Sequence, residues 1–339
     1  GLLDRIIDAN LNRATEALRV LEEIARFYFN DEEISRSLKM IRHSICKLFD
    51  SSYDKLIFAR DTQNDVGVHI ENPTKACGYK PNVESVFRAN FKRLEQALRV
   101  LGEYGGLSDD FRYKTYVIEK KMNARLKMDI KKYLLKDKKL YLVTNSDNFK
   151  TDEEFLDTVA LAVKSGVDIV QLREKTKPAA KIIEYGRVIR QLCSEYGALF
   201  IVNDRVDIAQ ILNADGVHLG QDDVDIKYAR DILGDKPIIG ISTHKPDDAI
   251  RAIQNGADYI GVGPVYRTPT KPGRDAAGLE YVKWAAQNVD IPFYAIGSID
   301  ETTIDEVISC GAKRVALVRA IMNSQDICRT VKRLKDKLV

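Results

Sequence analysis

From about Leu140 to its end, the chain repeats one unit: a short apolar run, a small polar cluster and a helix-like stretch. The apolar runs are Leu140–Thr144, Val167–Leu172, Leu199–Val202, Gly216–Leu219, Ile238–Ile241, Tyr259–Val262, Pro292–Ile296 and Arg314–Val318. Roughly eight such units predict a closed parallel (β/α)8 barrel, a fold whose active sites lie at the carboxyl ends of the strands. The polar clusters that end the runs therefore mark where chemistry is expected.

The first 135 residues follow a different pattern. Apolar residues recur at helical spacing over Leu2–Asn30, Glu32–Asp50, Asn82–Leu101 and Phe111–Leu135, whereas the Gly- and Pro-containing stretch Asp61–Pro81 predicts a loop. A chain of 339 residues is also long for one domain. We therefore expect an all-α domain over 1–135, a boundary near Asp137, and an α/β TIM barrel over 139–339.

Composition excludes several classes of function. A net charge of +3 gives no general affinity for nucleic acid, and no apolar run reaches the length of a membrane span. The five cysteines are scattered and the four histidines show no metal-ligand spacing, which argues against disulfides and a zinc site. We expect a cytoplasmic protein without nucleic-acid or membrane partners, and a homo-oligomer stays open.

The helical half contains an internal duplication, in which residues 9–23 recur as residues 89–103 at a constant offset (89 − 9 = 80). The recurring polar residues are Asn10 and Asn90, Arg13 and Arg93, Arg19 and Arg99, and Glu23 and Glu103. One interpretation is a pair of Arg–Glu networks on the surface, each of little energetic value. The other is a pseudo-symmetric pocket in which paired arginines bind an anionic ligand.

Two cations follow the second predicted strand. Alternation along an extended chain places Gln171, Arg173 and Lys175 on one side, where the two positive charges suit a phosphate or diphosphate. A strand end closed by a salt bridge to Glu174 is the alternative.

Aspartates follow the next two strands. Asp204 ends one strand, and the sequence Gly220–Asp223 ends the next, so their carboxylates are neighbours in a barrel. Either alone is commonly a turn residue or a helix cap. Together, beside cations, they indicate a shared Mg²⁺, which prefers few carboxylates, several waters and phosphate oxygens.

The later strand ends predict a second phosphate site. The loop with Thr268, Thr270 and Lys271, the turn at Gly297 and the pair Val318–Arg319 lie where many barrels bind phosphate through backbone amides. A flexible linker is the alternative for the loop. No Ser/His/Asp arrangement or Schiff-base lysine stands out, and His218 is expected to be structural. The inventory suits departure of diphosphate assisted by magnesium, with attack by a second phosphorylated substrate.

These motifs, in this order, resemble the thiamine-phosphate synthase family over about Lys139–Val339. The resemblance implies that a hydroxymethylpyrimidine diphosphate condenses with a hydroxyethylthiazole phosphate, with dissociative loss of diphosphate. It implies Mg²⁺ at Asp204 and Asp223 and catalytic roles for Arg173, Lys175, Ser242 and Lys271. The implied substrate-binding residues are Gln171, Leu172, Arg173, Glu174, Lys175, Asn203, Ser242, Thr268, Pro269, Thr270, Lys271, Gly297, Val318 and Arg319.

Two positions depart from that family. It often has a second glycine where this chain has Ser298, and Val-Ser where this chain has Val318–Arg319. Contacts through backbone amides would tolerate both changes, and Arg319 would add a charge.

The helical half resembles a domain found fused to this synthase and associated with phosphorylation of hydroxymethylpyrimidine phosphate. The resemblance rests on the Ala-Asn-x-x-Arg repeats and the Ala59–Gly67 segment, and it implies ATP as co-substrate. Its candidate site residues are Asn10, Arg13, Arg19, Asp61, Asn90, Arg93 and Arg99. No phosphate-binding glycine loop is present. The alternative for the helical half is a non-catalytic module for dimerisation or regulation.

The alternative for the barrel is an isomerase or aldolase reaction. The paired aspartates argue against it.

Overall fold

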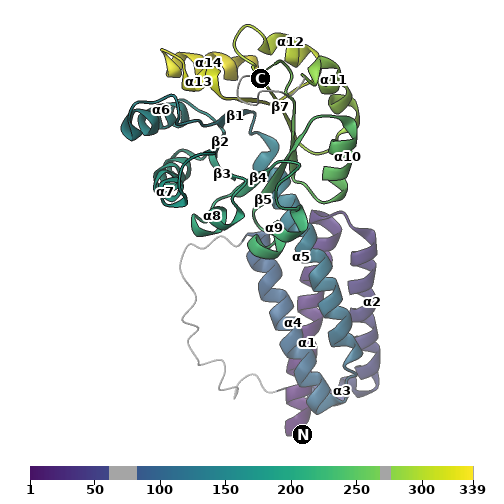
Figure 1. Cartoon of the computed structure of the whole chain (residues 1–339). Helices are drawn as coiled ribbons and strands as arrows, with labels where there is room; N and C mark the ends of the chain where they lie inside the picture. Colours follow the sequence, from purple (N-terminus) through teal and green to yellow (C-terminus); the bar gives the residue numbers. More distant parts are fainter. Residues whose placement is uncertain (61–81, 268–275, 339) are drawn as a thin grey trace. The chain divides into compact units, whose positions relative to one another are not determined.

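The chain forms two compact units, Gly1–Asp129 and Ile130–Val339 (Figure 1). This computed structural model describes residues 1–60, 82–267 and 276–338. The candidates Asp61, Thr268, Pro269, Thr270 and Lys271 lie outside the described residues. Among the described helices, each is too short or too polar to cross a lipid bilayer.

The first unit is all-helical, as the sequence predicts. Its elements are α1 (Leu2–Glu23), the π-helical turn η1 (Ile24–Tyr28), α2 (Glu32–Phe49), the 3₁₀ turn η2 (Asp50–Ser52), α3 (Tyr53–Phe58), α4 (Val83–Gly105) and α5 (Asp110–Lys136), whose last turns belong to the second unit. The Asp31 side chain caps α2 by accepting from the Ile34 amide at 2.9 Å, and Asn82 caps α4 in the same way. The short helix α3 was not foreseen.

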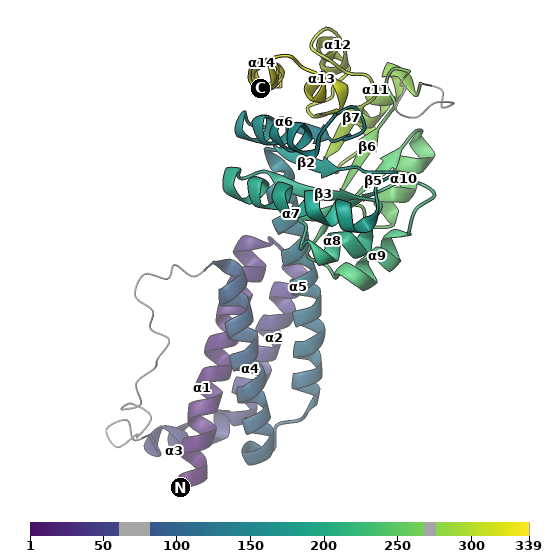
Figure 2. The same cartoon turned by 60° about the vertical axis from the view of Figure 1, so that its left-hand side comes forward.

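The duplicated sequence forms the centre of this helical unit. The two copies lie on α1 and α4, which pack side by side (Figure 2). Equivalent apolar positions are equally buried: Leu18 and its counterpart Leu98, and Leu21 and its counterpart Leu101, are at most 1% exposed. Two copies of one apolar stripe therefore build a shared core.

The second unit is a closed, parallel, eight-stranded barrel with strand order β1 to β8. The strands are β1 (Leu140–Val143), β2 (Ile169–Leu172), β3 (Leu199–Asn203), β4 (Gly216–Leu219), β5 (Ile238–Thr243), β6 (Tyr259–Val262), β7 (Phe293–Ile296) and β8 (Val315–Leu317). The helices are α6 (Asp152–Lys164), α7 (Ala179–Tyr196), α8 (Val206–Ile211), α9 (Ile226–Leu233), α10 (Pro246–Gln254), α11 (Gly278–Asn288), α12 (Ile304–Ser309), α13 (Arg319–Met322) and α14 (Ile327–Lys337). The predicted barrel is confirmed, each strand matching its apolar run to within two residues at either end.

Alternation along the strands divides their side chains between two cores. Tyr141, Ile201 and Tyr259 belong to the cluster inside the barrel, whereas Leu142 and Leu172 belong to the larger cluster between the strands and the surrounding helices. The interior cluster fills the barrel, so that only the ends of the strands are left for a ligand.

Candidate active site

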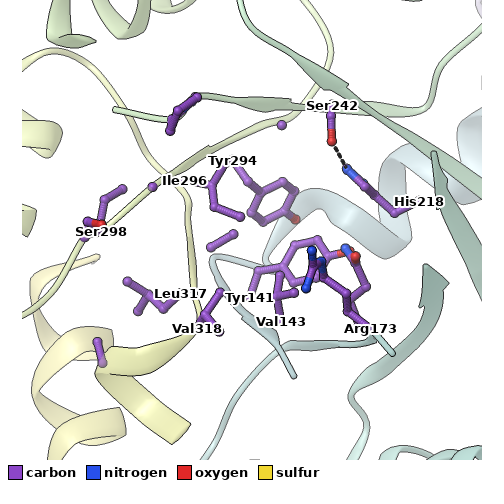
Figure 3. Close-up of a pocket in the computed structure, with 18 of the residues that line it drawn as sticks. Tyr141, Val143, Arg173, His218, Ser242, Tyr294, Ile296, Ser298, Leu317 and Val318 are labelled. Carbon is purple, nitrogen blue, oxygen red and sulfur yellow. Dashed lines mark hydrogen bonds between the residues drawn. The ribbon is translucent and has the colours of Figure 1, made fainter. Parts of the chain in front are cut away.

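A cavity of about 350 Å³ lies at the carboxyl ends of the barrel strands (Figure 3). Polar residues from successive strands line it together with a tyrosine-rich wall. The lining includes Tyr141, Val143, Gln171, Arg173, Asn203, His218, Ser242, Tyr259, Tyr294, Gly297, Ser298, Val318 and Arg319. Seven of the predicted substrate-binding residues (Gln171, Arg173, Asn203, Ser242, Gly297, Val318 and Arg319) therefore meet in one place.

A continuous hydrogen-bond chain crosses this cavity. The Gln171 side chain donates to the Tyr141 hydroxyl at 2.8 Å, and that hydroxyl lies 2.7 Å from the Tyr259 hydroxyl. The Tyr259 hydroxyl lies 2.9 Å from Nδ1 of His218, and Nε2 of His218 lies 2.8 Å from the Ser242 hydroxyl. Burial raises the pKa of both tyrosines, so the phenols stay neutral and hold their partners by hydrogen bonds alone.

Tyr141, His218, Tyr259 and Tyr294 were not identified as site residues from the sequence. His218 was expected to be structural; it lines the cavity and contacts Ser242 (Figure 3). Strand alternation was the available signal: Tyr141 is on the same face of β1 as Val143, and His218 lies opposite Asn203 in the pairing of β3 with β4.

A second cluster beside the cavity contains Lys175, Asp204 and Asp223. The Lys175 ammonium forms an ion pair with Asp204, and the Asp223 carboxyl lies within hydrogen-bonding reach of Asp204. Burial raises the pKa of Asp204, Lys175 opposes that rise, and Asp223 adds to it. Asp204 is in the left-handed region at φ 57°, a conformation that aspartate tolerates better than most residues.

Two facing carboxylates fit the requirements of Mg²⁺, which takes few protein ligands and keeps waters or substrate oxygens. Within the described ranges, no group of three or more His, Cys, Asp or Glu side chains is arranged to hold a metal ion. Asp204 and Asp223 therefore offer two carboxylates at most, and Lys175 supplies positive charge at the same place.

The turn after β7 depends on a glycine. Gly297 has φ 119°, and a Cβ there would come within 2.6 Å of the Pro264 Cα. The next residue, Ser298, has φ 52°, which accounts for the glycine often found there in the family that the sequence resembles. In this chain the Ser298 hydroxyl donates to the Arg267 carbonyl at 2.8 Å and accepts from Arg319 at 3.1 Å.

Two residues of the predicted set point elsewhere. The Leu172 side chain is buried in the outer core, so it cannot line the cavity. The Glu174 carboxylate accepts from the Ser146 hydroxyl at 2.7 Å and the Ser146 amide at 3.2 Å, and burial raises its pKa. Glu174 therefore braces the loop after β1, and the salt bridge to a neighbouring cation considered from the sequence is not formed.

The helical unit has a cavity of its own, of about 530 Å³. Asn10, Arg13 and Arg93 line it, and Asn90 accepts from Arg93 at 3.3 Å. The two other duplicated arginines do not join them: Arg19 pairs with Glu23 at 2.7 Å, and Arg99 with Glu103 at 2.6 Å. The duplicated arginines therefore differ in their surroundings: Arg19 and Arg99 are in ion pairs, and Arg13 and Arg93 lie at the cavity.

Comparisons with known proteins agree with this arrangement. Residues 140–321 match the family described as thiamine monophosphate synthase, and residues 5–121 match the ThiD2 family. A thiamine-phosphate synthase of Nostoc punctiforme is 44% identical over 329 residues, covering 95% of this chain and 90% of that protein. One from Synechocystis is 42% identical over 342 residues, covering 98% and 96%.

A solved structure supports the barrel separately. The thiamine phosphate pyrophosphorylase of Pyrococcus furiosus superposes with a TM-score of 0.55 at 34% identity, covering 62% of this chain and 97% of that one. The chain therefore belongs to the thiamine-phosphate synthase family, transferases of thiamine biosynthesis, and carries a ThiD2-family unit in front of its barrel.

Proposed function

We propose that the barrel joins hydroxymethylpyrimidine diphosphate to hydroxyethylthiazole phosphate, giving thiamine phosphate and diphosphate. The bond between the pyrimidine methylene carbon and the diphosphate oxygen breaks first, and its electrons leave with diphosphate. The lone pair of the thiazole nitrogen then forms the new carbon–nitrogen bond. The observation that carries this proposal is the convergence of Gln171, Arg173, Asn203 and Ser242 on one cavity beside Lys175 and Asp204.

Each group has a task in that reaction. Arg173 and Lys175 stabilise the negative charge that grows on the departing diphosphate, and Lys271 is proposed to assist them. Gln171 and Ser242, held by Tyr141 and His218, orient the pyrimidine. The backbone at Gly297, Val318 and Arg319, with Thr268 and Thr270, is proposed to hold the thiazole phosphate. A hydrophobic tyrosine wall excludes water that would otherwise capture the carbocation.

Asp204 and Asp223 are proposed to hold Mg²⁺. When bound, the ion supplies positive charge to the leaving diphosphate. Both carboxylates are held in position by the backbone. Asp204 adopts a left-handed conformation directly after β3, and Asp223 accepts a hydrogen bond from the Gly220 amide at 2.7 Å.

The test is Asp204→Asn in the full chain. Asparagine tolerates the left-handed backbone but carries no charge, so we expect the barrel to fold and synthase turnover to fall by about a hundredfold or more. Asp222→Asn is the matched control, since that exposed neighbour of Asp223 lines neither the cavity nor the cluster. Binding of Mn²⁺, followed by its paramagnetic resonance signal, gives a reading independent of turnover. Retained Mg²⁺-dependent turnover with undiminished Mn²⁺ binding in Asp204→Asn would refute the metal assignment.

We also propose that the helical unit phosphorylates hydroxymethylpyrimidine phosphate with ATP, which supplies the barrel with its diphosphate substrate. The support is the ThiD2-family match together with a cavity lined by Arg13 and Arg93. Phosphoryl transfer needs such cations mainly for positioning and charge stabilisation.

The Asp204→Asn chain tests this proposal as well, because it lets the diphosphate accumulate. With ATP and hydroxymethylpyrimidine phosphate we expect equal amounts of ADP and pyrimidine diphosphate, and none without ATP. A folded protein that makes neither would favour the second candidate, a module for dimerisation or regulation.

A further inference from the structure

The helical-unit cavity has an unusual charge pattern. Of the described residues, three cationic side chains, two carboxamides and no carboxylate line it; these polar residues are Asn10, Arg13, Lys92, Arg93 and Gln96. Six of the eight lining residues lie on α4 at helical spacing, among them Arg93, while Asn10 and Arg13 come from α1. The space between two packed helices is thus electropositive and open to a small anion.

The two arginines at this cavity differ from the other two duplicated arginines, Arg19 and Arg99, each of which pairs with a glutamate. Neither Arg13 nor Arg93 forms an ion pair with any acidic side chain in the part of the chain that the structure describes. Among the described residues, the hydrogen bond of Arg93 goes to the Asn90 carboxamide oxygen, a neutral acceptor. Lys92, by contrast, is paired with Glu95 at 2.8 Å. Within residues 1–60, 82–267 and 276–338, no carboxylate pairs with either of these two guanidinium groups.

The duplication repeats this contrast. In each copy, the arginine three residues after the asparagine is directed to the cavity, and the arginine six residues later is paired on the surface with a glutamate. The asparagines are buried and donate to the carbonyl four residues earlier, Asn10 to Ile6 and Asn90 to Val86, each at 2.8 Å. Their carboxamide oxygens are thereby oriented toward the following turn. Packing of apolar stripes alone does not require this polar pattern twice.

We propose that this cavity binds the phosphoryl group of a small-molecule substrate, with Arg13 and Arg93 as its charged ligands and Arg19 and Arg99 excluded. This rests on the proposed kinase function and names the residues that perform its binding step. A guanidinium presents a fork of donors that matches the oxygens of a phosphate, and a dianionic phosphate monoester would balance the two unpaired charges. The cavity is open to solvent on one side, so the phosphate of a small molecule can reach both guanidinium groups.

The experiment is site-resolved modification of arginines by phenylglyoxal in the full chain, read by mass spectrometry. The modification is measured without ligand, with hydroxymethylpyrimidine phosphate and with ATP. Because each arginine is read separately, a phosphate bound in the barrel does not affect the result for the helical cavity. At a ligand concentration about ten times its Kd, modification of Arg13 and Arg93 should slow about tenfold in at least one arm. Arg19 and Arg99 are internal controls and should react at unchanged rates. The arm that protects identifies which substrate brings the phosphate.

Variants give the second reading. Arg13→Ala/Arg93→Ala should raise the KM for the protecting substrate by about tenfold or more, whereas Arg19→Ala/Arg99→Ala should change it less than about twofold. All four side chains are exposed, and an unchanged helical circular dichroism signal and melting temperature verify that the helical unit folds. ATP-dependent phosphorylation without protection of Arg13 and Arg93 would overturn the site and leave the kinase standing. Protection without phosphoryl transfer would retain the site and refute the kinase.

Discussion

At the scale of the residue, the barrel site depends on backbone positions as much as on side chains. Gly297 has φ 119° and lies against Pro264, so the β7 end can approach the neighbouring loop only because a Cβ is absent. Ser298 follows with φ 52° and uses its hydroxyl to join Arg267 and Arg319. The shape of this turn is thus set by two positive φ angles and by the hydrogen bonds of Ser298. A sequence motif names the residues but not these angles and contacts.

Gly297→Ala should destabilise the turn after β7 by more than the cost of its positive φ angle. The new Cβ would meet the Pro264 Cα at 2.6 Å, so the loops must separate where the thiazole phosphate is proposed to bind. We expect a loss of stability of about 2–3 kcal/mol and a KM for the thiazole phosphate raised about tenfold or more. Gly166→Ala is the control, because its φ of 111° imposes similar backbone strain while the nearest atom to a Cβ there is 3.4 Å away, on the flexible Lys335 side chain. Equal effects of the two variants on stability and KM would contradict the argument.

Tyr141→Phe tests the hydrogen-bond chain behind Gln171. It removes one hydroxyl and leaves the Gln171 amide and the Tyr259 hydroxyl without their buried partner. We expect a loss of about 1–2 kcal/mol and a KM for the pyrimidine diphosphate raised several-fold, about fivefold, since Gln171 is no longer oriented. Tyr281→Phe removes a comparable buried hydroxyl, bonded to Thr243 at 2.7 Å, away from Gln171. Urea denaturation measures the stability of both variants, and steady-state kinetics measure their KM. An equal rise in KM for both would contradict an orienting role for Tyr141.

At the scale of the element, the sequence was sufficient for the strands and the long helices. Apolar runs bounded by polar clusters gave all eight strands because a barrel strand is buried on both faces. Alternation also placed Gln171 and Arg173 together on the cavity side. Alternation did not reveal α3, whose six residues are too few for a periodic signal. Nor did it reveal Asp258, just before β6, whose carboxylate accepts from Arg230 of α9 and from the Ile239 amide of the neighbouring strand β5. Such ties join residues far apart in the chain, so no local pattern reports them.

The contact between α4 and α5 should make stability depend on pH. Burial and the neighbouring Glu95 raise the pKa of Glu119 to about 7, from an ordinary value of 4.5. Between these values the folded state holds more protons than the unfolded state, so this contribution to stability is complete below about pH 4.5 and is lost as pH rises through about 7.

Glu119→Gln should remove that dependence. We expect the variant to be more stable than the parent by about 1 kcal/mol at about pH 8, a modest figure because the pair is partly exposed, and to match it near pH 5. Glu103→Gln, an exposed glutamate paired with Arg99, is the control. Denaturation by urea, followed by the helical circular dichroism signal at the two pH values, measures the difference. A gap between parent and Glu119→Gln that is the same at both pH values would show that Glu119 does not titrate in this range.

At the scale of the whole molecule, the change of pattern near residue 135 predicted two structural classes, and both are present. The compact units divide at Asp129 and Ile130, within α5, whereas the sequence placed its boundary near Asp137. The change in sequence pattern marks where the helical repeat ends and the strand repeat begins. The helix α5 crosses the division between the units, so its last turns pack with the second unit before the pattern changes. The same limit applies to the helical site: the duplication named four arginines, and only packing separated Arg13 and Arg93 from Arg19 and Arg99.

Each candidate site is built wholly within one unit, the barrel cavity from residues of 141–320 and the helical cavity from residues of 10–100. The two activities should therefore be separable by mutation and should complement between molecules. Asp204→Asn should make pyrimidine diphosphate but little thiamine phosphate. At substrate concentrations below its raised KM, Arg13→Ala/Arg93→Ala should make little pyrimidine diphosphate, but it should make thiamine phosphate when the diphosphate is supplied. Mixed, with ATP, hydroxymethylpyrimidine phosphate and the thiazole phosphate, they should restore thiamine phosphate at a rate that rises with the concentration of the kinase-competent variant. If each variant keeps its own half-reaction and the mixture still yields nothing, the intermediate does not pass between molecules, and the two sites must act within one chain.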